Sequence, residues 1–394
     1  MKNNRTFLEK LLDGAEVEWK TLDEIFHLRN GYTPSKGVKE YWENGSIPWF
    51  RMEDIRENGR VLNTALQKVS ESAVKGGKLF PANSIIIATS ATIGEHALIT
   101  IPFLANQRFT VLSLKPEYID KFNIYFLYHY CFTLDDWCQK NTTMSSFASV
   151  DMNGFRKFLI PIPPLSVQTE IVKILDALTA LTSELTSELI LRQKQYEYYR
   201  EKLLSEEELE KVGFEWKYLT QVADLTRGRV ISKEYLSDNV GDYPVYSSQT
   251  VDNGEIGKID SFDFDGEFVS WTTDGANAGT VFYRSGKFSI TNVCGLIKIK
   301  NNPELNYKFL FYWLSIEAKK HVYSGMGNPK LMSHQMEKIK IPIPPLSIQT
   351  KIVKILDKFE SLTHSITEGL PLAIEQSQKR YEYYRELLLN FHNP

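Results

Sequence analysis

Two stretches of the chain carry apolar residues at alternating steps of three and four, the spacing that forms a single stripe along a helix. A long helix is therefore predicted over residues 166–204, roughly 58 Å long at 1.5 Å per residue, with a counterpart over residues 347–390. Because an apolar stripe is unstable in water, we expect the two helices to pack against each other. The stripe residues are Ile171, Ile174, Leu178, Leu181 and Leu185 in the first helix, and Ile352, Ile355, Phe359 and Leu362 in the second.

Strand patterns dominate the longer region that precedes each helix. Runs rich in β-branched and aromatic residues are bounded by Gly, Asn, Asp or Pro, and aromatic-rich segments with helical spacing lie among them. Each region is expected to fold as a compact α+β domain with a small mixed or antiparallel sheet. The predicted strands are Ser84–Ala88, Phe109–Leu114, Gly266–Trp271 and Gly295–Lys300, and the predicted helices are Asn123–Cys138 and Asn306–Tyr323.

The chain repeats itself. Residues 160–176 and 341–357 both read Ile-Pro-Ile-Pro-Pro-Leu-Ser-x-Gln-Thr-x-Ile-Val-Lys-Ile-Leu-Asp. The hexapeptide Tyr-Glu-Tyr-Tyr-Arg-Glu also occurs twice, from Tyr196 and from Tyr381, and Glu-Trp-Lys opens each half. An internal two-fold repeat is thus predicted, with globular regions 1–159 and 212–340, a helical region and linker 160–211, and a second helical region 341–394.

The helical regions also carry signals for where each helix starts and stops. Ser166 and Ser347 follow the Pro-rich segments and are predicted N-caps. Gly369-Leu-Pro371 predicts a break in the second helix, because proline disrupts a helix interior. Residues Glu206–Glu210 are interpreted as a solvated acidic linker.

A tetrad is repeated within the first predicted helix. Thr182-Ser-Glu-Leu185 is followed directly by Thr186-Ser-Glu-Leu189, so four residues act here as a local unit of helix length.

Composition and charge are those of an ordinary globular protein. The chain is 42% hydrophobic and 24% charged, and its net charge of -3 does not by itself indicate a nucleic-acid binder. No run approaches the ~18 apolar residues of a membrane span, so we expect a cytoplasmic protein with no membrane partner. The cysteines Cys131, Cys138 and Cys294 show no pairing or zinc-binding spacing, which fits a reducing compartment and predicts no metal site.

Catalytic signatures are missing from the sequence. It has no Gly-x-x-x-x-Gly-Lys-Ser/Thr phosphate loop, no Gly-x-Gly-x-x-Gly following a strand and no Asn-Pro-Pro-aromatic segment of the amino-methyltransferase kind. No Ser/His/Asp or Cys/His set is suggested by spacing. We therefore expect no catalytic residues and no covalent chemistry in this chain.

Further motifs accompany the repeat. The Pro-rich segments and the Tyr-x-Tyr-Tyr-Arg-x-x-Leu-Leu helix ends are the longest of them. The shorter ones are Leu8–Gly14, Val17–Trp19, Gly45–Trp49 and Ser90–Gly94 in the first half, and Tyr243–Gln249, Trp271–Asn277 and Asn292–Gly295 in the second.

With these motifs the chain resembles the specificity subunit of type I restriction-modification systems over nearly its whole length. The resemblance implies two target recognition domains, each reading one half of a bipartite site on double-stranded DNA, and two antiparallel helices that form a coiled-coil spacer. It also implies docking of two methylation subunits and of restriction subunits. S-adenosylmethionine, ATP and Mg²⁺ would then belong to those partners, with no cofactor in this chain.

Target recognition requires side chains that reach base edges in the major groove, where Arg suits guanine and Asn or Gln suits adenine. Such residues belong on loops and strand ends. The two variable regions differ strongly, so two unlike half-sites are expected, whereas Trp49 and Trp271 are interpreted as core or wall residues. The candidates are Tyr32, Thr33, Lys36, Arg51, Thr89, Ser90, Thr92, Asn106, Gln107 and Arg108, and then Arg227, Arg229, Ser247, Ser248, Gln249, Thr272, Thr273, Asn277, Asn292 and Lys330.

Three alternatives stay open on the residues alone. A stand-alone DNA-binding regulator could use the same duplicated scaffold, although the sequence has no basic block to support it. The apolar stripes by themselves also permit an adaptor that binds only proteins. A nuclease with scattered carboxylates is the third alternative.

Overall fold

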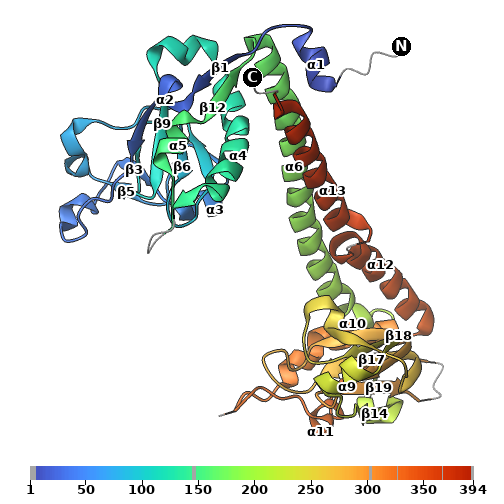
Figure 1. Ribbon diagram of the computed structural model, residues 1–394. Helices are drawn as coiled ribbons and strands as arrows, with labels where there is room; N and C mark the ends of the chain where they lie inside the picture. The colour runs from blue at the N-terminus through green and yellow to red at the C-terminus, as the bar shows by residue number, and fades with distance from the viewer. Residues whose placement is uncertain (1–5, 144–147, 301–303, 326, 366, 392–394) are drawn as a thin grey trace, which may run out of the picture. The chain divides into compact units, whose positions relative to one another are not determined.

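The computed structural model describes residues 6–143, 148–300, 304–325, 327–365 and 367–391. The chain divides into two compact units, residues 1–184 with 375–394 and residues 185–374 (Figure 1). Each unit combines one globular α+β domain with parts of both long helical regions. The division falls inside the first long helix, so these units cut across the linear segments expected from the sequence.

The first domain is built around strand β6 (Ser84–Ala88), whose five residues are all buried and which packs against helix α4 (Ile124–Lys140). Ile85 and Ile87 face the helix α4, while Ile86 and Ala88 join a second apolar cluster on the opposite face. Because successive side chains of a strand point to opposite faces, a strand covered on both sides reads as a continuous apolar run. The predicted strands 84–88 and 109–114 and the predicted helix 123–138 are confirmed as β6, β9 and α4.

The sheets of the first domain are small. A five-stranded sheet has the order β2-β9-β6-β7-β4, and a three-stranded sheet has the order β5-β3-β8. The elements are α1 (Phe7–Leu12), β1 (Glu18–Thr21), α2 (Leu22–Ile25), β2 (Phe26–Asn30), β3 (Ile47–Phe50), α3 (Met52–Asn58), β4 (Val61–Leu62), β5 (Lys68–Val69), β6 (Ser84–Ala88), β7 (His96–Ile99), β8 (Leu104–Ala105), β9 (Phe109–Leu114), α4 (Ile124–Lys140), β10 (Thr142–Thr143), β11 (Ser149–Val150), α5 (Met152–Lys157) and β12 (Leu159–Ile162).

The second domain contains one six-stranded sheet with the order β14-β19-β17-β18-β15-β16, mixed because β15 runs parallel to β18. The predicted strands 266–271 and 295–300 are confirmed as parts of β17 and β19. The elements are α7 (Glu206–Glu210), β13 (Glu215–Tyr218), α8 (Leu219–Val222), β14 (Ala223–Arg227), α9 (Lys233–Asp238), β15 (Val240–Tyr246), β16 (Glu255–Ile259), β17 (Phe264–Thr272), β18 (Val281–Ile290), β19 (Cys294–Ile299), α10 (Tyr307–Glu317), α11 (Ser333–Met336) and β20 (Lys340–Ile343).

The two domains share a repeated frame, which we define as a terminal strand pair and three sheet strands. In the terminal pairs, β1 joins β12 and β13 joins β20, and Trp19 lies opposite Pro161 as Trp216 lies opposite Pro342. The sheet strands β2-β9-β6 have the same order as β14-β19-β17. Each terminal pair therefore joins the start of a domain to the Pro-rich segment at its end.

A buried glutamine fastens each domain to the long helix that follows it. The side chain of Gln168 accepts a hydrogen bond from the Asn123 amide at 2.9 Å and donates to the carbonyls of Lys121 and Pro163 at 3.0 and 2.8 Å. Gln349 makes the same three bonds, with the Asn306 amide at 2.9 Å and with the Glu304 and Pro344 carbonyls at 2.6 and 2.8 Å. Both glutamines are 0% exposed. We call these two networks the glutamine clamps.

The first long helix is continuous, as predicted, and the second is interrupted. Helix α6 spans Leu165–Leu203, whereas the second region forms α12 (Leu346–His364) and α13 (Gly369–Leu389). The break therefore precedes the predicted position. Pro371 lies in the first turn of α13, where a missing amide proton removes no helical hydrogen bond.

The predicted N-caps are wrong by two residues. Helices α6 and α12 start at leucines, and the residue before each is a proline. The carbonyl of Pro345 accepts hydrogen bonds from the amides of Ile348 and Gln349 at 2.8 and 3.1 Å, so Pro345 is the N-cap of α12. Ser347 and its equivalent Ser166 lie within the first turn instead.

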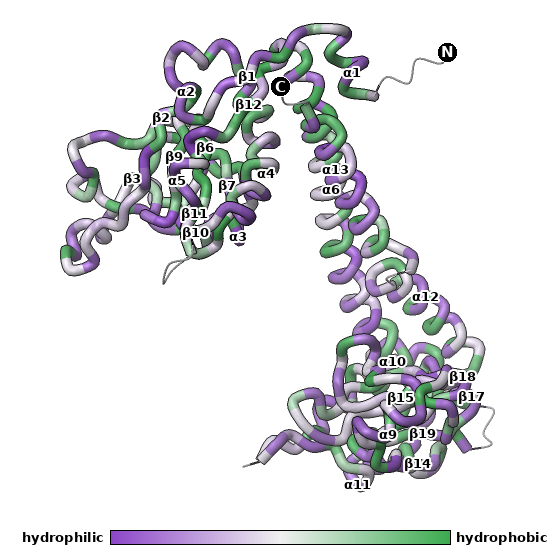
Figure 2. Tube along the Cα trace, in the orientation of Figure 1, coloured by the Kyte–Doolittle hydropathy of each residue, from purple (hydrophilic) through white to green (hydrophobic). Residues whose placement is uncertain are grey.

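The long helices pack on each other within both units. In the first unit, the hydroxyls of Thr182 and Ser377 are 2.8 Å apart. In the second unit, the ring of Tyr199 stacks on Phe359 at 5.6 Å, and Tyr196 meets His364 edge-on at 5.6 Å. As the residue number increases from Tyr196 to Tyr199, that of the contacting residue decreases from His364 to Phe359, so the two helices run antiparallel. Hydrophobic and hydrophilic residues alternate along these helices (Figure 2).

The predicted stripe residues differ in exposure. Ile171 and Ile352 lie in the apolar cores, with Leu175 and Leu356 wholly buried one turn further on. The helices are thus rotated from the predicted stripe near their starts, because they also pack on the core of the adjacent domain. Leu181 and Ile355 are 38% and 41% exposed. The remaining stripe residues, Ile174, Leu178, Leu185, Phe359 and Leu362, are half-buried.

The acidic segment after α6, predicted as a solvated linker, forms the short helix α7, in which Glu206, Glu207 and Glu210 are exposed. Ser205 caps the amide of Glu208, and Leu209 is buried at 1% exposure. Leu209 belongs to the apolar core of the second unit. No helix within the described residues is long and apolar enough to cross a membrane.

Replacing a clamp glutamine is expected to destabilise its domain. Gln349→Ala should lower the free energy of unfolding by about 2–3 kcal/mol, because it leaves one buried amide and two carbonyls without a partner. Denaturant titration followed by tryptophan fluorescence measures the change. The exposed Gln376→Ala is the matched control and should stay within about 0.5 kcal/mol. Equal stability of the two variants would show that the clamp contributes nothing.

Candidate nucleic-acid interface

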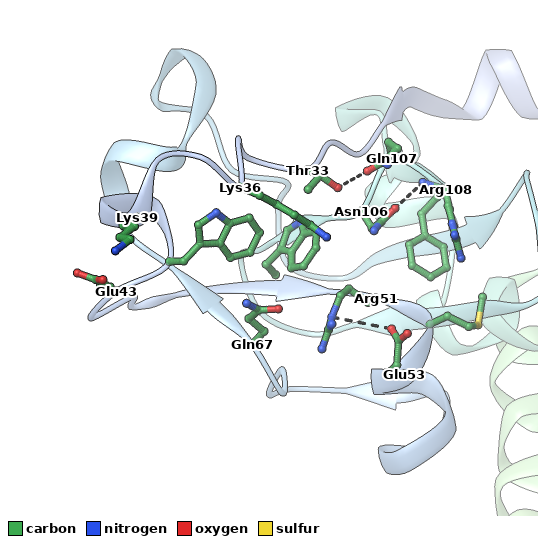
Figure 3. A pocket seen from close by; sticks show the side chains of 14 residues that line it. Thr33, Lys36, Lys39, Glu43, Arg51, Glu53, Gln67, Asn106, Gln107 and Arg108 are labelled. Atoms are coloured by element: carbon green, nitrogen blue, oxygen red, sulfur yellow. Dashed lines mark hydrogen bonds and ion pairs between the residues drawn. The ribbon is translucent and has the colours of Figure 1, made fainter.

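A cavity of about 690 Å³ opens in the first domain where the loops after β2 and β3 meet the loop before β9 (Figure 3). Six of the ten residues proposed from the sequence for this domain line it. They are Thr33, Lys36, Arg51, Asn106, Gln107 and Arg108. Residues 75 positions apart in the chain are thus brought into one polar cavity.

A glycine makes this meeting of loops possible. The amide of Gly31 donates to the carbonyl of Phe109 at 3.0 Å, and a Cβ at Gly31 would lie 2.3 Å from the carbonyl oxygen of Ala105. Gly228, which follows the equivalent strand β14, would place a Cβ 2.2 Å from the carbonyl oxygen of Ile290. Both domains therefore cross their loops at a point that only glycine permits.

The polar groups of the cavity are partly engaged with one another. The Thr33 hydroxyl bonds the Gln107 side-chain oxygen, and the Asn106 side-chain oxygen accepts from the Arg108 amide at 2.9 Å. These bonds hold the loop before β9 in place. Figure 3 shows the amide and guanidinium groups along the cavity.

Aromatic rings form the floor of the cavity. Trp42 and Trp49 meet edge-to-face with centroids 5.1 Å apart, and the Arg51 guanidinium lies 5.6 Å from the Trp49 ring. Arg51 also reaches Glu53 at 3.9 Å. The position of Trp49, 3% exposed with its indole N–H donating to the Tyr32 carbonyl, matches the predicted role as a wall residue. Besides these rings, the charged groups of Lys36, Arg51 and Arg108 line the cavity.

Four other candidates of the first domain lie outside the cavity. The hydroxyl of Tyr32 donates to the Ala73 carbonyl at 3.1 Å and accepts from the Lys75 amide at 2.9 Å. The Thr89 amide donates to the Arg108 carbonyl at 3.0 Å, which brings the end of β6 beside the cavity. Ser90 follows Thr89 and forms a β-bridge with Ser149, and the Thr92 hydroxyl is buried with no hydrogen-bond partner among the described residues.

The second domain has a charged cluster at the topologically equivalent place. Arg227 ends β14, and its Nη2 donates to the Thr273 hydroxyl at 2.9 Å and approaches Asp274 at 3.5 Å. Lys330 forms a β-bridge with Asp274, and its Nζ lies 3.9 Å from that carboxylate. We call Arg227, Thr273, Asp274 and Lys330 the arginine cluster. Three of its four members were predicted from the sequence.

The remaining candidates of the second domain form smaller groups. Arg229 donates to both carboxylate oxygens of Asp263 at 3.1 and 3.0 Å. The Thr291 hydroxyl donates to Ser247 at 2.9 Å, Asn277 donates to the Ser248 carbonyl at 3.2 Å, and Gln249 bonds the Glu255 carbonyl. Thr272 is 0% exposed and bonds the Asn277 carbonyl, whereas Asn292 is exposed.

Several residues of these sites were missed by the sequence reasoning. Trp42, Gln67 and Glu53 line the cavity, and Asp274 and Asp263 hold the arginines of the second domain. The search was for donors to bases, so carboxylates that orient those donors were passed over. The signal was available for Asp274, because it follows directly on two proposed threonines.

A buried arginine lies near the second site. Arg284 is 3% exposed, donates to the Ser270 hydroxyl at 3.0 Å and lies 3.6 Å from the centroid of the Tyr246 ring. Burial lowers the pKa of Arg284 to about 10. It serves to position β15 against β18, and it is not accessible to a ligand.

No group of three or more His, Cys, Asp or Glu residues within the described ranges could hold a metal ion. The cysteines are all buried. Burial raises the pKa of Cys138 to about 12 and of Cys294 to about 11, and it raises that of Cys131 well above its usual value. The thiolates needed for nucleophilic chemistry are thereby suppressed.

Sequence comparison identifies the scaffold that carries these two sites. The model of the type I restriction modification DNA specificity domain matches residues 15–192 and 211–376. The chain belongs to this family. The two matched segments correspond to the two halves of the repeat, so the family unit is one domain together with its helix.

Curated relatives cover nearly the full chain. The EcoprrI specificity subunit of Escherichia coli is 50% identical, with 92% of each chain covered. A putative type I restriction enzyme specificity subunit of Haemophilus influenzae is 41% identical over 99% of this chain and 100% of its own.

Solved structures show the same fold. The specificity subunit from M. genitalium is 16% identical, with a TM-score of 0.55 over 100% of this chain and 98% of its own. A chain from a structure titled for complex assembly and conformational transition of the type I R-M system is 17% identical, with a TM-score of 0.62 over 95% of this chain and 98% of its own. The chain is thus a type I specificity subunit with two target recognition domains.

Buried thiols predict a simple chemical result. In mildly alkaline buffer the native protein should not react with a thiol reagent such as DTNB, because burial keeps its thiols protonated and out of reach. In denaturant all three cysteines should react. Rapid reaction of a native thiol would contradict the burial of that cysteine.

Proposed function

We propose that this specificity subunit reads an asymmetric bipartite DNA site, with the cavity of the first domain on one half-site and the arginine cluster of the second domain on the other. The observation that carries the proposal is a repeated frame with unlike chemistry at equivalent positions. Asn30 at the end of β2 is the counterpart of Arg227 at the end of β14. Ser90, two residues after β6, is the counterpart of Asp274, two residues after β17. Two unlike reading sites are expected to select two unlike sequences.

The side chains at both sites suit readout in the major groove. Arginine and lysine donate to guanine, and asparagine and glutamine pair with adenine. Arg51, Arg108, Asn106 and Gln107 supply these groups in the first domain, and Arg227 and Lys330 supply them in the second. Because they extend from loops and strand ends, they can differ between domains without altering the core.

We propose that partner subunits, and not this chain, hold the phosphate backbone of the DNA. A net charge of -3 gives weak attraction to phosphates, which supply most of the affinity of protein–DNA complexes. Phosphate contacts position a protein on DNA, and base contacts specify the sequence. A nearly neutral reading subunit is therefore best explained by two methylation subunits that hold the duplex, with restriction subunits joining them.

Catalysis is likewise assigned to those partners. We propose that the methylation subunits bind S-adenosylmethionine and modify adenine, and that the restriction subunits use ATP and Mg²⁺. This chain then requires no cofactor and acts in the cytoplasm, where the host DNA lies. The suppressed thiols are consistent with a binding role.

The first domain can be tested at a single base. In a complex with the methylation subunits, Arg108→Ala should reduce discrimination about ten- to a hundredfold at one position of one half-site, because a lost bidentate contact removes that much selectivity. Sequencing of methylated sites from a randomised DNA library measures it. Lys78→Ala, an exposed residue of the same domain, is the control and should change nothing. A relaxed position in both half-sites would contradict the assignment of one domain to each half.

The repeated tetrad of α6 offers a test of the spacer. Deleting Thr182–Leu185 removes about 6 Å of helix, which corresponds to about two base pairs of B-DNA. The preferred number of unread base pairs should therefore fall by one or two, as measured by the same sequencing assay. Ser183→Ala, which keeps the helix length, should retain the parental spacing. Unchanged spacing in the deletion variant would reject a measuring role for α6.

A further inference from the structure

Arg227 is held by a directional chain of hydrogen bonds. The Thr273 hydroxyl accepts from Arg227 Nη2 at 2.9 Å and lies 2.7 Å from Asp274 Oδ2, to which it donates its single proton. Thr273 is 0% exposed, so this hydroxyl has no freedom to turn toward water. The order Arg227 to Thr273 to Asp274 therefore sets the direction of the guanidinium.

The rest of the guanidinium stays available. The side chain of Arg227 is 40% exposed, and within the described part of the chain its hydrogen bond to Thr273 and its approach to Asp274 both use Nη2. An arginine has five N–H donors in a rigid fork, so Nη1 and the second hydrogen on Nη2 remain free to act as a pair. This end-on pair matches the O6 and N7 acceptors of guanine.

Two internal comparisons support a reading role for this arrangement. Arg229, two residues away, is held in a different manner. Its Nε donates to both carboxylate oxygens of Asp263, and its guanidinium lies 4.9 Å from the centroid of the Tyr235 ring. Asp263 thus accepts directly from its arginine, through Nε. Asp274 instead accepts from the Thr273 hydroxyl, which itself accepts from Arg227 Nη2, and the carboxylate lies 3.5 Å from that nitrogen.

The equivalent network of the first domain is neutral. There Asn30 accepts from the Thr110 hydroxyl at 3.1 Å, and Thr110 lies 3.0 Å from the Thr89 hydroxyl. The fold is therefore built without a charge at this place. At the equivalent position the second domain has the carboxylate of Asp274, 3.5 Å from Arg227 Nη2. Lys330 at 3.9 Å partly neutralises it.

We propose that Asp274 is a positioning residue which, through Thr273, aims Arg227 at a guanine in the half-site read by the second domain. The proposal rests on the proposed function, because it requires this domain to read DNA. Asp274 would make no contact with a base. It determines specificity by fixing the arginine before the duplex arrives, which lowers the ordering cost of a long side chain.

The test uses the assembled methylation complex and compares discrimination ratios, defined as methylation of the parental duplex divided by methylation of a duplex with one base pair changed. Arg227→Ala, Asp274→Ala and Asp274→Asn are assayed on duplexes that vary one base pair of the second half-site at a time. Arg227→Ala should relax one G·C position about ten- to a hundredfold. Asp274→Ala should relax the same position, and Asp274→Asn should retain much of the parental ratio because its amide oxygen still accepts from Thr273. The double variant should resemble Arg227→Ala alone.

Discrimination ratios separate positioning from damage to the fold, since a misfolded domain lowers methylation of every duplex equally. Asp263→Ala, which removes the partner of Arg229, is the matched control and should leave that position unchanged. If Arg227→Ala relaxes a position and Asp274→Ala does not, the inference falls while the proposed function stands. If Arg227→Ala changes no ratio, the arginine cluster does not read DNA. Failure of both Asp274 variants to assemble would make Asp274 a structural residue, and a relaxed A·T position would exclude guanine.

Discussion

One buried side chain in each half, Gln168 or Gln349, determines how a recognition domain is attached to its helix. Its amide satisfies the N–H of a helix N-cap residue, one carbonyl just before that cap and one carbonyl within the proline-rich segment. Since a buried polar group without a partner is costly, this geometry admits little variation. The same attachment in both halves lets the rest of each domain diverge.

The divergence is concentrated where the strands end. Both domains keep the three-strand frame and a glycine at the loop crossing, Gly31 or Gly228. Around that crossing, the first domain has amides and arginines over tryptophan rings, whereas the second has an arginine tied to a threonine and a carboxylate. Core packing and the proposed base selection thus involve separate sets of residues, so that a new specificity could arise without a new fold.

The charge of the chain fits this division of labour. With 46 basic against 49 acidic residues, the chain has no excess of positive charge to attract phosphates. Its arginines are held by neighbouring groups of the protein, which limits the freedom they lose on meeting a base. Such a charge balance suits the proposal that partner subunits bind the phosphates.

The amino-acid sequence by itself determined the repeat, the long helices, the central strands and the family, because these depend on local periodicity and on long identical segments. Six of the residues that it proposed for DNA contact also line one cavity of the first domain, since they lie on loops next to strand ends. Only the tertiary structure decided that Pro345 caps α12, that Glu206–Glu210 is helical and that Leu175 and Leu356 are the deeply buried positions. It alone brought Asp274 to Arg227, 47 positions away. Such pairings arise from strand register and loop crossing, which join residues distant in the chain and leave no local pattern.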